Sequence, residues 1–317
     1  MTPAPLTKSQ RLLAYAQLMR LPNVFTAMAD IFMGFWFTHE TLSPVATFLL
    51  LLLSSSCLYT AGMVLNDVFD IEQDRRERPN RPLPSGRIDS KTAALLGWSL
   101  LAAGVIFGWC AGLLAGRLLP GIIATILAAF VVLYDRFLKR TPWGPVGMGI
   151  CRGLNVILGM SASVRPLGIV HQYIAQCLGC YVVGVTWFAR REASSSRRGD
   201  LICGFVIIAT AIILLLDFPS LMRANELDTS VRFMPRPMMF VSAFFLWSFL
   251  VLLTLPFLIA IIFPIPAAVQ TAVKFGILSI IVLDALVVLP VRGVWPAQTV
   301  LLLLIPALIL GRWVYST

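Results

Sequence analysis

Long apolar runs follow one another along almost the whole chain, and they constrain the fold more than any other feature of the sequence. A helix of roughly 20 apolar residues crosses the hydrocarbon core of a bilayer. Runs of about this length lie near residues 22–38, 45–66, 92–115, 119–135, 143–163, 167–189, 200–218, 238–262, 268–290 and 295–314. Pro256, Pro264 and Pro266 either kink one long helix or separate two. We therefore expect an all-α, polytopic membrane bundle of nine or ten transmembrane helices, formed by residues 1–317 as a single domain.

The composition excludes most other classes of protein. The chain is 58% hydrophobic and 13% charged, whereas soluble domains are about 45–50% apolar and about 25% charged. Soluble enzymes, disordered chains and nucleic-acid-binding modules all need more polar surface, so we expect no nucleic acid partner despite the net charge of +10. The preference for arginine over lysine suits forked recognition of phosphate or carboxylate.

The basic residues are distributed unevenly between the two sides of the predicted membrane. The N-terminal tail and the second, fourth and sixth connections hold sixteen Lys and Arg residues, against five in the first, third, fifth and seventh connections. Such an excess marks the cytoplasmic side. We expect an integral protein of a bacterial-type inner membrane, with the N-terminus and the even-numbered connections in the cytoplasm.

An acidic cluster continues directly from the second apolar run. If the helix persists, Asn66, Asp70 and Asp74 follow at intervals of four residues, and Asp67 projects beside them on the same face. Such oxygen ligands repel one another unless a hard cation neutralises them, and Mg²⁺ bound by carboxylates and substrate phosphates is the usual solution. The alternative is an acidic helix end that pairs with the arginines that follow it, Arg75, Arg76 and Arg78.

The next segment, residues 77–88, is rich in proline and arginine. Three prolines within six residues favour a stiff, extended loop that holds Arg78, Arg81 and Arg87 near the acidic cluster, where it could cap a pocket. The alternative is an ordinary turn between membrane helices whose arginines face lipid headgroups.

The two segments together carry a resemblance to a known family. NDVFDIEQDRRERPNRPLPSGRI resembles the first Asp-rich motif and the following loop of the UbiA superfamily of intramembrane prenyltransferases. A weaker likeness is YDRFLKRT at residues 134–141, which is similar to the family's segment after the fourth helix.

The resemblance implies a helical bundle around a central cavity, which binds a prenyl diphosphate with Mg²⁺ and opens to the lipid for the isoprenoid tail. Carried over by position, Asn66, Asp70 and Asp74 would coordinate Mg²⁺, with Asp67 supporting them. The three aspartates are thus candidate catalytic residues. Arg81 and Lys139 would bind the diphosphate. The implied reaction is transfer of the prenyl group to an acceptor that the sequence does not identify.

The chain departs from the family at the end of the sixth predicted helix, where a second Asp-rich motif is expected. Before Asp200 this region contains a single acid, Glu192, preceded by Arg190 and Arg191. One interpretation is that the two arginines bind the diphosphate in place of a second metal ion. The other is that they complement a helix C-terminus and the positive-inside rule.

Two polar residues lie inside the fifth apolar run. Arg152 and Asn155 are spaced to share one helix face. An arginine at this depth is costly unless it meets an anion or a water-filled cavity, so we favour a catalytic, substrate-facing role for Arg152 and diphosphate binding for Asn155. The alternative is a structural pair with a buried acid. Asp30 is positioned to reach the cavity, whereas we expect Asp217 and Asp284 to lie near helix ends, at the interface.

The leading interpretation is therefore a membrane-embedded prenyltransferase. The runner-up is a non-catalytic isoprenoid or lipid carrier of the same fold that retained only the first motif. A secondary transporter is a third interpretation, but it requires inverted repeats that the sequence does not show.

Overall fold

The computed structural model describes residues 7–191, 197–224 and 236–314, and within them all regular elements are helical. The α-helices are α1 (Lys8–Leu18), α2 (Leu21–Thr38), α3 (Val45–Phe69), α4 (Ile71–Glu77), α5 (Ser90–Ala115), α6 (Leu119–Arg136), α7 (Gly144–Met160), α8 (Ile169–Phe188), α9 (Arg198–Ala224), α10 (Arg236–Ile262), α11 (Pro266–Arg292), α12 (Val294–Leu301) and α13 (Leu304–Trp313). Two short 3₁₀ turns follow α6 and α8, at Leu138–Arg140 and Ala189–Arg191.

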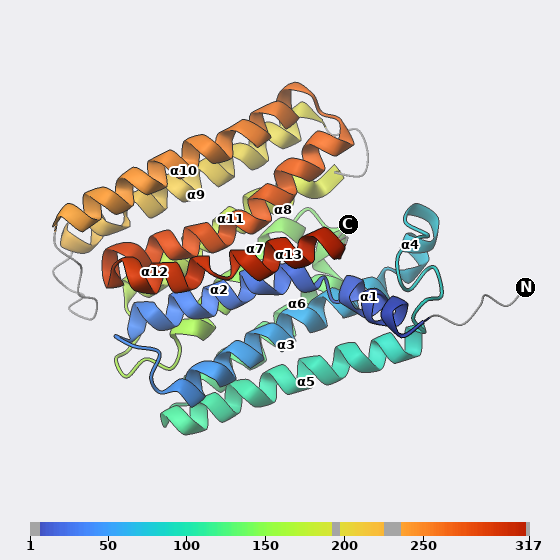
Figure 1. Cartoon of the computed structure of the whole chain (residues 1–317), viewed down its shortest axis with the longest axis horizontal. Coiled ribbons are helices and arrows are strands. Elements are labelled where there is room, and N and C mark those ends of the chain that lie inside the picture. The colour runs from blue at the N-terminus through green and yellow to red at the C-terminus, as the bar shows by residue number, and fades with distance from the viewer. Residues whose placement is uncertain (1–6, 192–196, 225–235, 315–317) are drawn as a thin grey trace, which may run out of the picture.

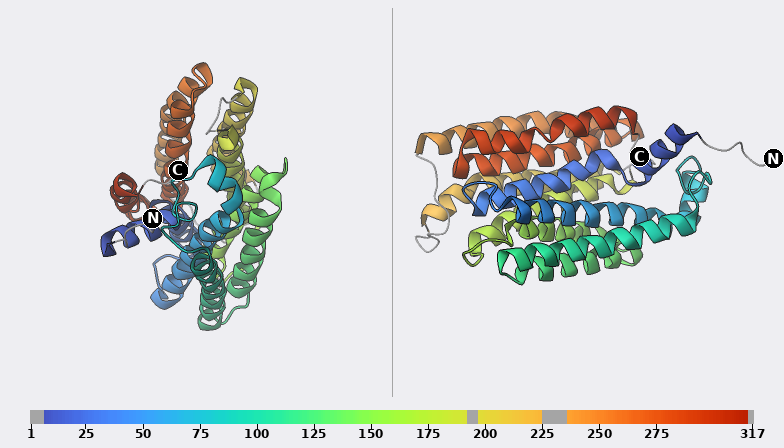
Figure 2. Two further views of the ribbon diagram at one scale, coloured as in Figure 1. Left: turned by 90° about the vertical axis from the view of Figure 1, so that its right-hand side faces the viewer. Right: turned by 60° about the horizontal axis from the view of Figure 1, so that its bottom comes forward.

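The long helices run roughly along one direction and form an elongated bundle, while the short α1 and α4 lie at one end of it (Figures 1 and 2). Helix α11 runs through the interior. In an 18-residue apolar stretch of α11, 72% of the residues are buried. The corresponding share is 28% for α5 and 17% for the α12–α13 pair. Helices α5, α12 and α13 therefore turn much of their apolar surface outward, as expected for helices that face lipid tails.

Eight helical segments of the described chain are long and apolar enough to span a bilayer. The remaining two predicted runs form α2 and α7, which pack inside the same bundle. Helix α7 has 17 residues, and both helices carry buried polar groups, Asp30 on α2 and Arg152 on α7. The all-α membrane bundle is thus confirmed. The prediction of nine or ten spans exceeds the eight that length and composition support.

Proline and capping residues account for many of the helix boundaries. Thr7 caps α1 with a full capping box, and the carboxylate of Asp89 accepts a hydrogen bond from the Thr92 amide at the start of α5. At the C-terminal end, α10 stops at Ile262 and α11 starts at Pro266, so two helices form there. Pro256 lies inside α10.

Paired glycines allow two of the helix crossings. A Cβ atom on Gly34 would lie 2.8 Å from the Gly159 carbonyl carbon, and one on Gly149 would lie 2.7 Å from the Gly179 oxygen. Without side chains at these positions, the backbones of α2 and α7, and of α7 and α8, approach closely. These contacts fix the centre of the bundle.

Candidate active site

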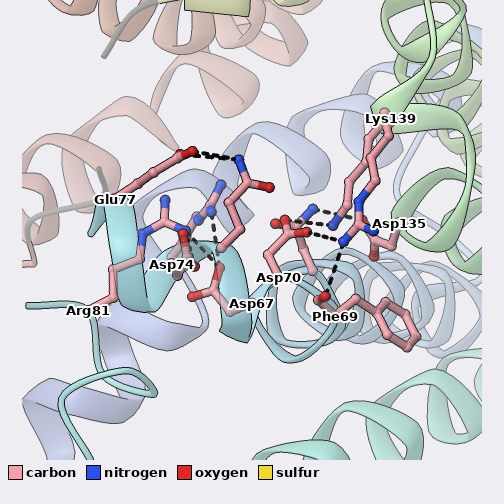
Figure 3. Close-up of polar contacts among 12 residues, drawn as sticks. Asp67, Phe69, Asp70, Asp74, Glu77, Arg81, Asp135 and Lys139 are labelled. Carbon is pink, nitrogen blue, oxygen red and sulfur yellow. Dashed lines mark hydrogen bonds and ion pairs between the residues drawn. The ribbon is translucent and has the colours of Figure 1, made fainter. Parts of the chain in front are cut away.

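The acidic cluster lies where α3 ends, and the helix does not continue through it as predicted. Helix α3 ends at Phe69, and α4 begins at Ile71. Asp70 is the junction, with φ −97° and ψ 7°. The backbone hydrogen bonds continue through this bend: the amide of Asp70 donates to the Asn66 carbonyl, and the amide of Asp74 donates to the Asp70 carbonyl. The bend divides the predicted single face into two groups of polar side chains (Figure 3).

The first group joins Asp67 and Asp74 to arginines. Arg81 Nη1 lies 2.8 Å from Asp74 Oδ2 and 3.3 Å from Asp67 Oδ1. Arg20, at the start of α2, lies 3.3 Å from the same Asp67 oxygen. Burial disfavours the charged guanidinium of Arg20, yet its pKa is raised above the usual value because the Asp67 carboxylate lies against it. Both carboxylates are buried, and a buried negative charge is costly unless a positive charge lies beside it. Arg20 and Arg81 supply that positive charge.

The loop after α4 positions Arg81. Its backbone folds back on itself, with the amide of Ile88 donating to the carbonyl of Pro82 at 3.2 Å. Arg87 fastens the loop to α1 by donating to Gln17 at 2.9 Å. Of the three loop arginines predicted to lie near the acids, Arg81 contacts them directly, whereas Arg87 turns away toward α1.

The second group lies between α3 and the end of α6. Lys139 Nζ is 2.7 Å from Asp70 Oδ2, and Arg140 Nη2 is 3.2 Å from Asp70 Oδ1. Beside them, the amide nitrogen of Asn66 donates to Asp135 Oδ1 at 3.0 Å. The second Asp135 oxygen is buried and has no hydrogen-bond partner. Asp135 was not among the predicted site residues. The sequence feature that could have indicated it is its position: Asp135 is an acid at the end of an apolar run, within the segment YDRFLKRT that resembles the family.

The donor set fits a hard cation such as Mg²⁺. Within the described part of the chain, no three His, Cys, Asp or Glu side chains gather closely enough to form a metal site by themselves. Mg²⁺ does not need such a cage, because it is commonly held by one or two carboxylates together with substrate phosphates and water. The unpartnered buried oxygen of Asp135, next to Asn66, is the kind of ligand that it takes.

Arg152 and Asn155 pair with another acid, Asp30, and not with the acids of these two groups. Arg152 Nη2 is 2.8 Å from Asp30 Oδ1, and Asn155 donates to Asp30 Oδ2 at 2.7 Å while accepting from Ser55 at 2.7 Å. Ser55 precedes Asn66 by eleven positions on α3, about 16 Å at about 1.5 Å per residue. The structure therefore favours the structural pair with a buried acid.

Asp284 corrects a further expectation. It is fully buried within α11, rather than near a helix end at the interface. Its carboxylate lies 3.9 Å from Arg152, so two acids share one arginine.

Arg190 joins two connections at the same end of the bundle. Its guanidinium stacks on Trp187 at 4.3 Å and donates to the Pro142 carbonyl at 2.6 Å. Arg190 is thereby held beside the segment that carries Lys139 and Arg140, but it contacts none of the acids described above. The Arg191 side chain and the whole of Glu192 lie outside the described residues.

Comparison with known proteins gives consistent matches. The UbiA prenyltransferase family matches residues 27–317. The digeranylgeranylglyceryl phosphate synthase of Sulfurisphaera tokodaii is 35% identical over 155 residues, which are 48% of this chain and 49% of that protein. The synthase of the same name from Sulfolobus acidocaldarius is 36% identical over 159 residues, 49% of this chain and 54% of that protein. The chain thus spans about half the length of the curated relatives it matches.

A solved structure agrees with the fold. A UbiA homologue from Archaeoglobus fulgidus, bound to GPP and Mg²⁺, superposes with a TM-score of 0.59 over 84% of this chain and 99% of that one, at 15% identity. Identity this low supports the arrangement of the helices alone.

Proposed function

Because the chain belongs to the UbiA prenyltransferase family, we propose that it transfers a prenyl group from a prenyl diphosphate to an acceptor nucleophile, with Mg²⁺, inside the membrane. The observation that carries the proposal is the meeting of Asp70 with Lys139 and Arg140, next to Asn66 and the unpartnered oxygen of Asp135. A site for a metal diphosphate needs carboxylates for the metal and cations for the phosphates in one place. Both are present at this end of the bundle.

Asn66, Asp70 and Asp135 would hold the metal ion. When bound, Mg²⁺ supplies positive charge to the diphosphate as the leaving group departs. Lys139 and Arg140 now neutralise Asp70. With a donor bound, Lys139 and Arg140 would instead donate to its phosphate oxygens, which would leave the Asp70 carboxylate available to the metal ion. Arg81 would act in the same way: with its guanidinium on the diphosphate, Asp74 and Asp67 would be available to hold a metal ion.

The proposed reaction breaks one bond of the donor and forms one bond to the acceptor. The allylic C–O bond of the donor breaks, and its electron pair stays on the diphosphate. The prenyl cation is captured by an electron pair of the acceptor, which then loses a proton. The products are the prenylated acceptor, diphosphate and one proton. Lys139, Arg140 and Arg81 stabilise the charge that develops on the leaving group, while the apolar bundle limits access of water to the cation.

The test is diphosphate release by the purified protein in bilayer discs, supplied with Mg²⁺, prenyl diphosphates of increasing chain length and, as the source of acceptor, a lipid extract of the cells that produce the protein. We expect release that stops when EDTA removes the metal. Asp70→Asn and Asp135→Asn should each lower the rate by about a hundredfold or more, because each removes a charged metal ligand at nearly constant volume. Mg²⁺-dependent binding of a non-hydrolysable thiodiphosphate analogue should weaken in parallel.

Asp89→Asn is the matched control. It makes the same change in an exposed acid that caps α5, where Asn serves equally well. Full activity of Asp135→Asn at limiting Mg²⁺ would remove Asp135 from the metal site. Donor binding without any release of diphosphate would instead favour a non-catalytic carrier, an alternative that receives no support from relatives named as synthases.

A further inference from the structure

Helix α1 lies at the edge of the bundle, at the end that carries the acidic cluster. It precedes α2 by two residues, and it extends sideways when the molecule is viewed from that end (Figure 2, left). One face of α1 packs inward, where Ala14 and Leu18 are fully buried. The opposite face carries Lys8, Arg11 and Leu12, spaced by three and four positions. A helix that runs sideways at the end of a membrane bundle is placed to lie along the membrane surface.

The outward face of α1 presents apolar surface next to positive charge. The Leu12 side chain is 73% exposed, and its neighbour Leu13 is also exposed. The side chains of Lys8 and Arg11 make no ion pair or hydrogen bond with any residue that the structure describes, and α1 contains no acid. Helices with exposed leucines and basic side chains lie in the boundary between headgroups and acyl chains, where the long basic side chains reach up to the headgroups. This face of α1 therefore suits a negatively charged membrane surface.

Exposed tryptophans place the membrane surface at the level of α1. Trp98 near the start of α5, Trp143 immediately before α7 and Trp313 at the end of α13 are all exposed at this end of the bundle. Tryptophan is enriched at the boundary between lipid and water. Trp313 follows Arg312, which lines the same pocket as Arg20, the residue before α2. Helix α1 ends two residues before α2 and therefore lies close to headgroup depth.

The inward face of α1 supports the loop that positions Arg81. Leu18 lies in one apolar cluster with Leu83 and Ile88 of that loop. Arg87, also in the loop, donates a hydrogen bond to the same helix. Because the loop packs on α1, a contact that holds α1 in place also holds the loop and Arg81. Helix α1 thus connects the membrane surface to the acidic cluster.

We propose that α1 binds anionic lipid headgroups of the surrounding membrane through Lys8 and Arg11, with Leu12 among the acyl chains, and that this contact stabilises the loop in the arrangement that presents Arg81 to the donor. The occupant of the outward face is the lipid of the protein's own membrane, because α1 lies close to headgroup depth and its charged side chains are both basic. Each basic residue near an anionic membrane surface strengthens binding to it about fivefold. The coupling to Arg81 rests on the proposed function, because it takes the acidic cluster as the donor site.

The first test locates position 12 relative to the lipid. In a full-length chain whose six cysteines have been replaced, a fluorophore is attached to Leu12→Cys in bilayer discs of phosphatidylcholine and phosphatidylglycerol, with a nitroxide quencher on the acyl chains. We expect strong quenching, because the quencher acts only at short range. Arg76→Cys, an exposed position on α4 at the same end, is the matched control and should not be quenched. Equal quenching at both positions would overturn the proposal. So would a fluorophore at position 12 that neither the lipid quencher nor aqueous iodide reaches, since another protein chain would then cover this face.

The second test measures the coupling to the donor site. Binding of the thiodiphosphate analogue with Mg²⁺ is titrated in discs of phosphatidylcholine alone and in discs that also contain phosphatidylglycerol. We expect the wild type to bind about fivefold more tightly with the anionic lipid, at the lower end of typical couplings between two sites. Surface charge alone acts in the opposite direction, because an anionic surface repels an anionic donor.

Lys8→Gln combined with Arg11→Gln should abolish this lipid dependence. Both side chains are exposed, so the fold should tolerate the change. The matched control, Arg75→Gln combined with Arg76→Gln, removes two exposed charges from α4 at the same end and should keep the fivefold difference. Loss of the difference in the control as well would reduce the effect to general positive charge and overturn the proposal.

Failure of this proposal is distinguishable from failure of the proposed function. If lipid quenches the fluorophore at position 12 but the wild type binds no thiodiphosphate analogue in either kind of disc, the proposed function fails and the coupling fails with it, while the lipid-binding face of α1 remains. If the analogue binds equally well with and without the anionic lipid, the coupling through α1 is overturned and the donor site stands.

Discussion

A charge buried in the bundle has to be matched by another group, and Arg152 illustrates how this chain does so. Its guanidinium pairs with Asp30 and donates to the carbonyl of Thr26 at 2.7 Å, with Asp284 nearby. Asn155 completes the set by donating to Asp30. These groups join α2, α7 and α11, so their geometry specifies how three central helices pack. Removing one partner would leave a buried charge without compensation, which is far more costly than losing an exposed ion pair.

We predict that Arg152→Gln lowers the free energy of unfolding by about 3–5 kcal/mol, the cost of breaking a buried pair. Among molecules that remain folded, KM for the prenyl donor should stay unchanged. Thermal unfolding in detergent and donor kinetics at low temperature measure the two effects separately. Arg136→Gln, an exposed arginine on α6, is the control and should change stability by less than about 0.5 kcal/mol. A raised donor KM with unaltered stability would restore the substrate-facing role.

At the scale of elements, apolar run length predicted the helices well, because the bilayer demands it. The division of the polar residues was harder to predict. A regular helix through residues 66–74 places Asn66, Asp70 and Asp74 on one face, and nothing local in the sequence marks Asp70 as the bend. The contacts to Lys139 and Arg140, about 70 positions away in the sequence, accompany that bend. Asp135 escaped prediction for a similar reason, since its partner Asn66 is distant in the chain.

Close helix crossings are a second property of the elements that tertiary contacts determine. We predict that Gly159→Ala destabilises the bundle by about 1–3 kcal/mol, the usual cost of overpacking, because its Cβ atom would lie 2.8 Å from the Asp30 carbonyl oxygen. The control is Gly199→Ala on α9, where a Cβ atom meets nothing within 4 Å. Thermal unfolding of both variants in the same detergent makes the comparison. If the two variants were equally stable, α2 and α7 would be able to move apart without a loss in the free energy of unfolding, and the prediction would be wrong.

At the scale of the whole molecule, one end of the bundle gathers the polar chemistry. The connections after α3, α6 and α8 lie together there, linked by Lys139 to Asp70 and by Arg190 to Pro142. The start of α2 and the end of α13 reach the same end, where Arg20 and Arg312 line a pocket of about 420 Å³ together with Arg81. The proposed donor would therefore place its diphosphate at one surface of the membrane, with its apolar tail directed into the bilayer. Which surface this is follows from the distribution of charge.

The excess of sixteen basic residues against five predicts that this end faces the cytoplasm. In a chain whose six cysteines have been replaced, Ser85→Cys lies in the loop at the polar end, and Thr41→Cys lies in the connection between α2 and α3 at the other end. Both positions are exposed, so an impermeant maleimide should label each of them in detergent, which serves as the reactivity control. In intact cells we expect labelling of Thr41→Cys only, and of Ser85→Cys only after the membrane is permeabilised. The reverse pattern would place the acidic cluster on the outside, and the prenyl donor would then have to be supplied from there.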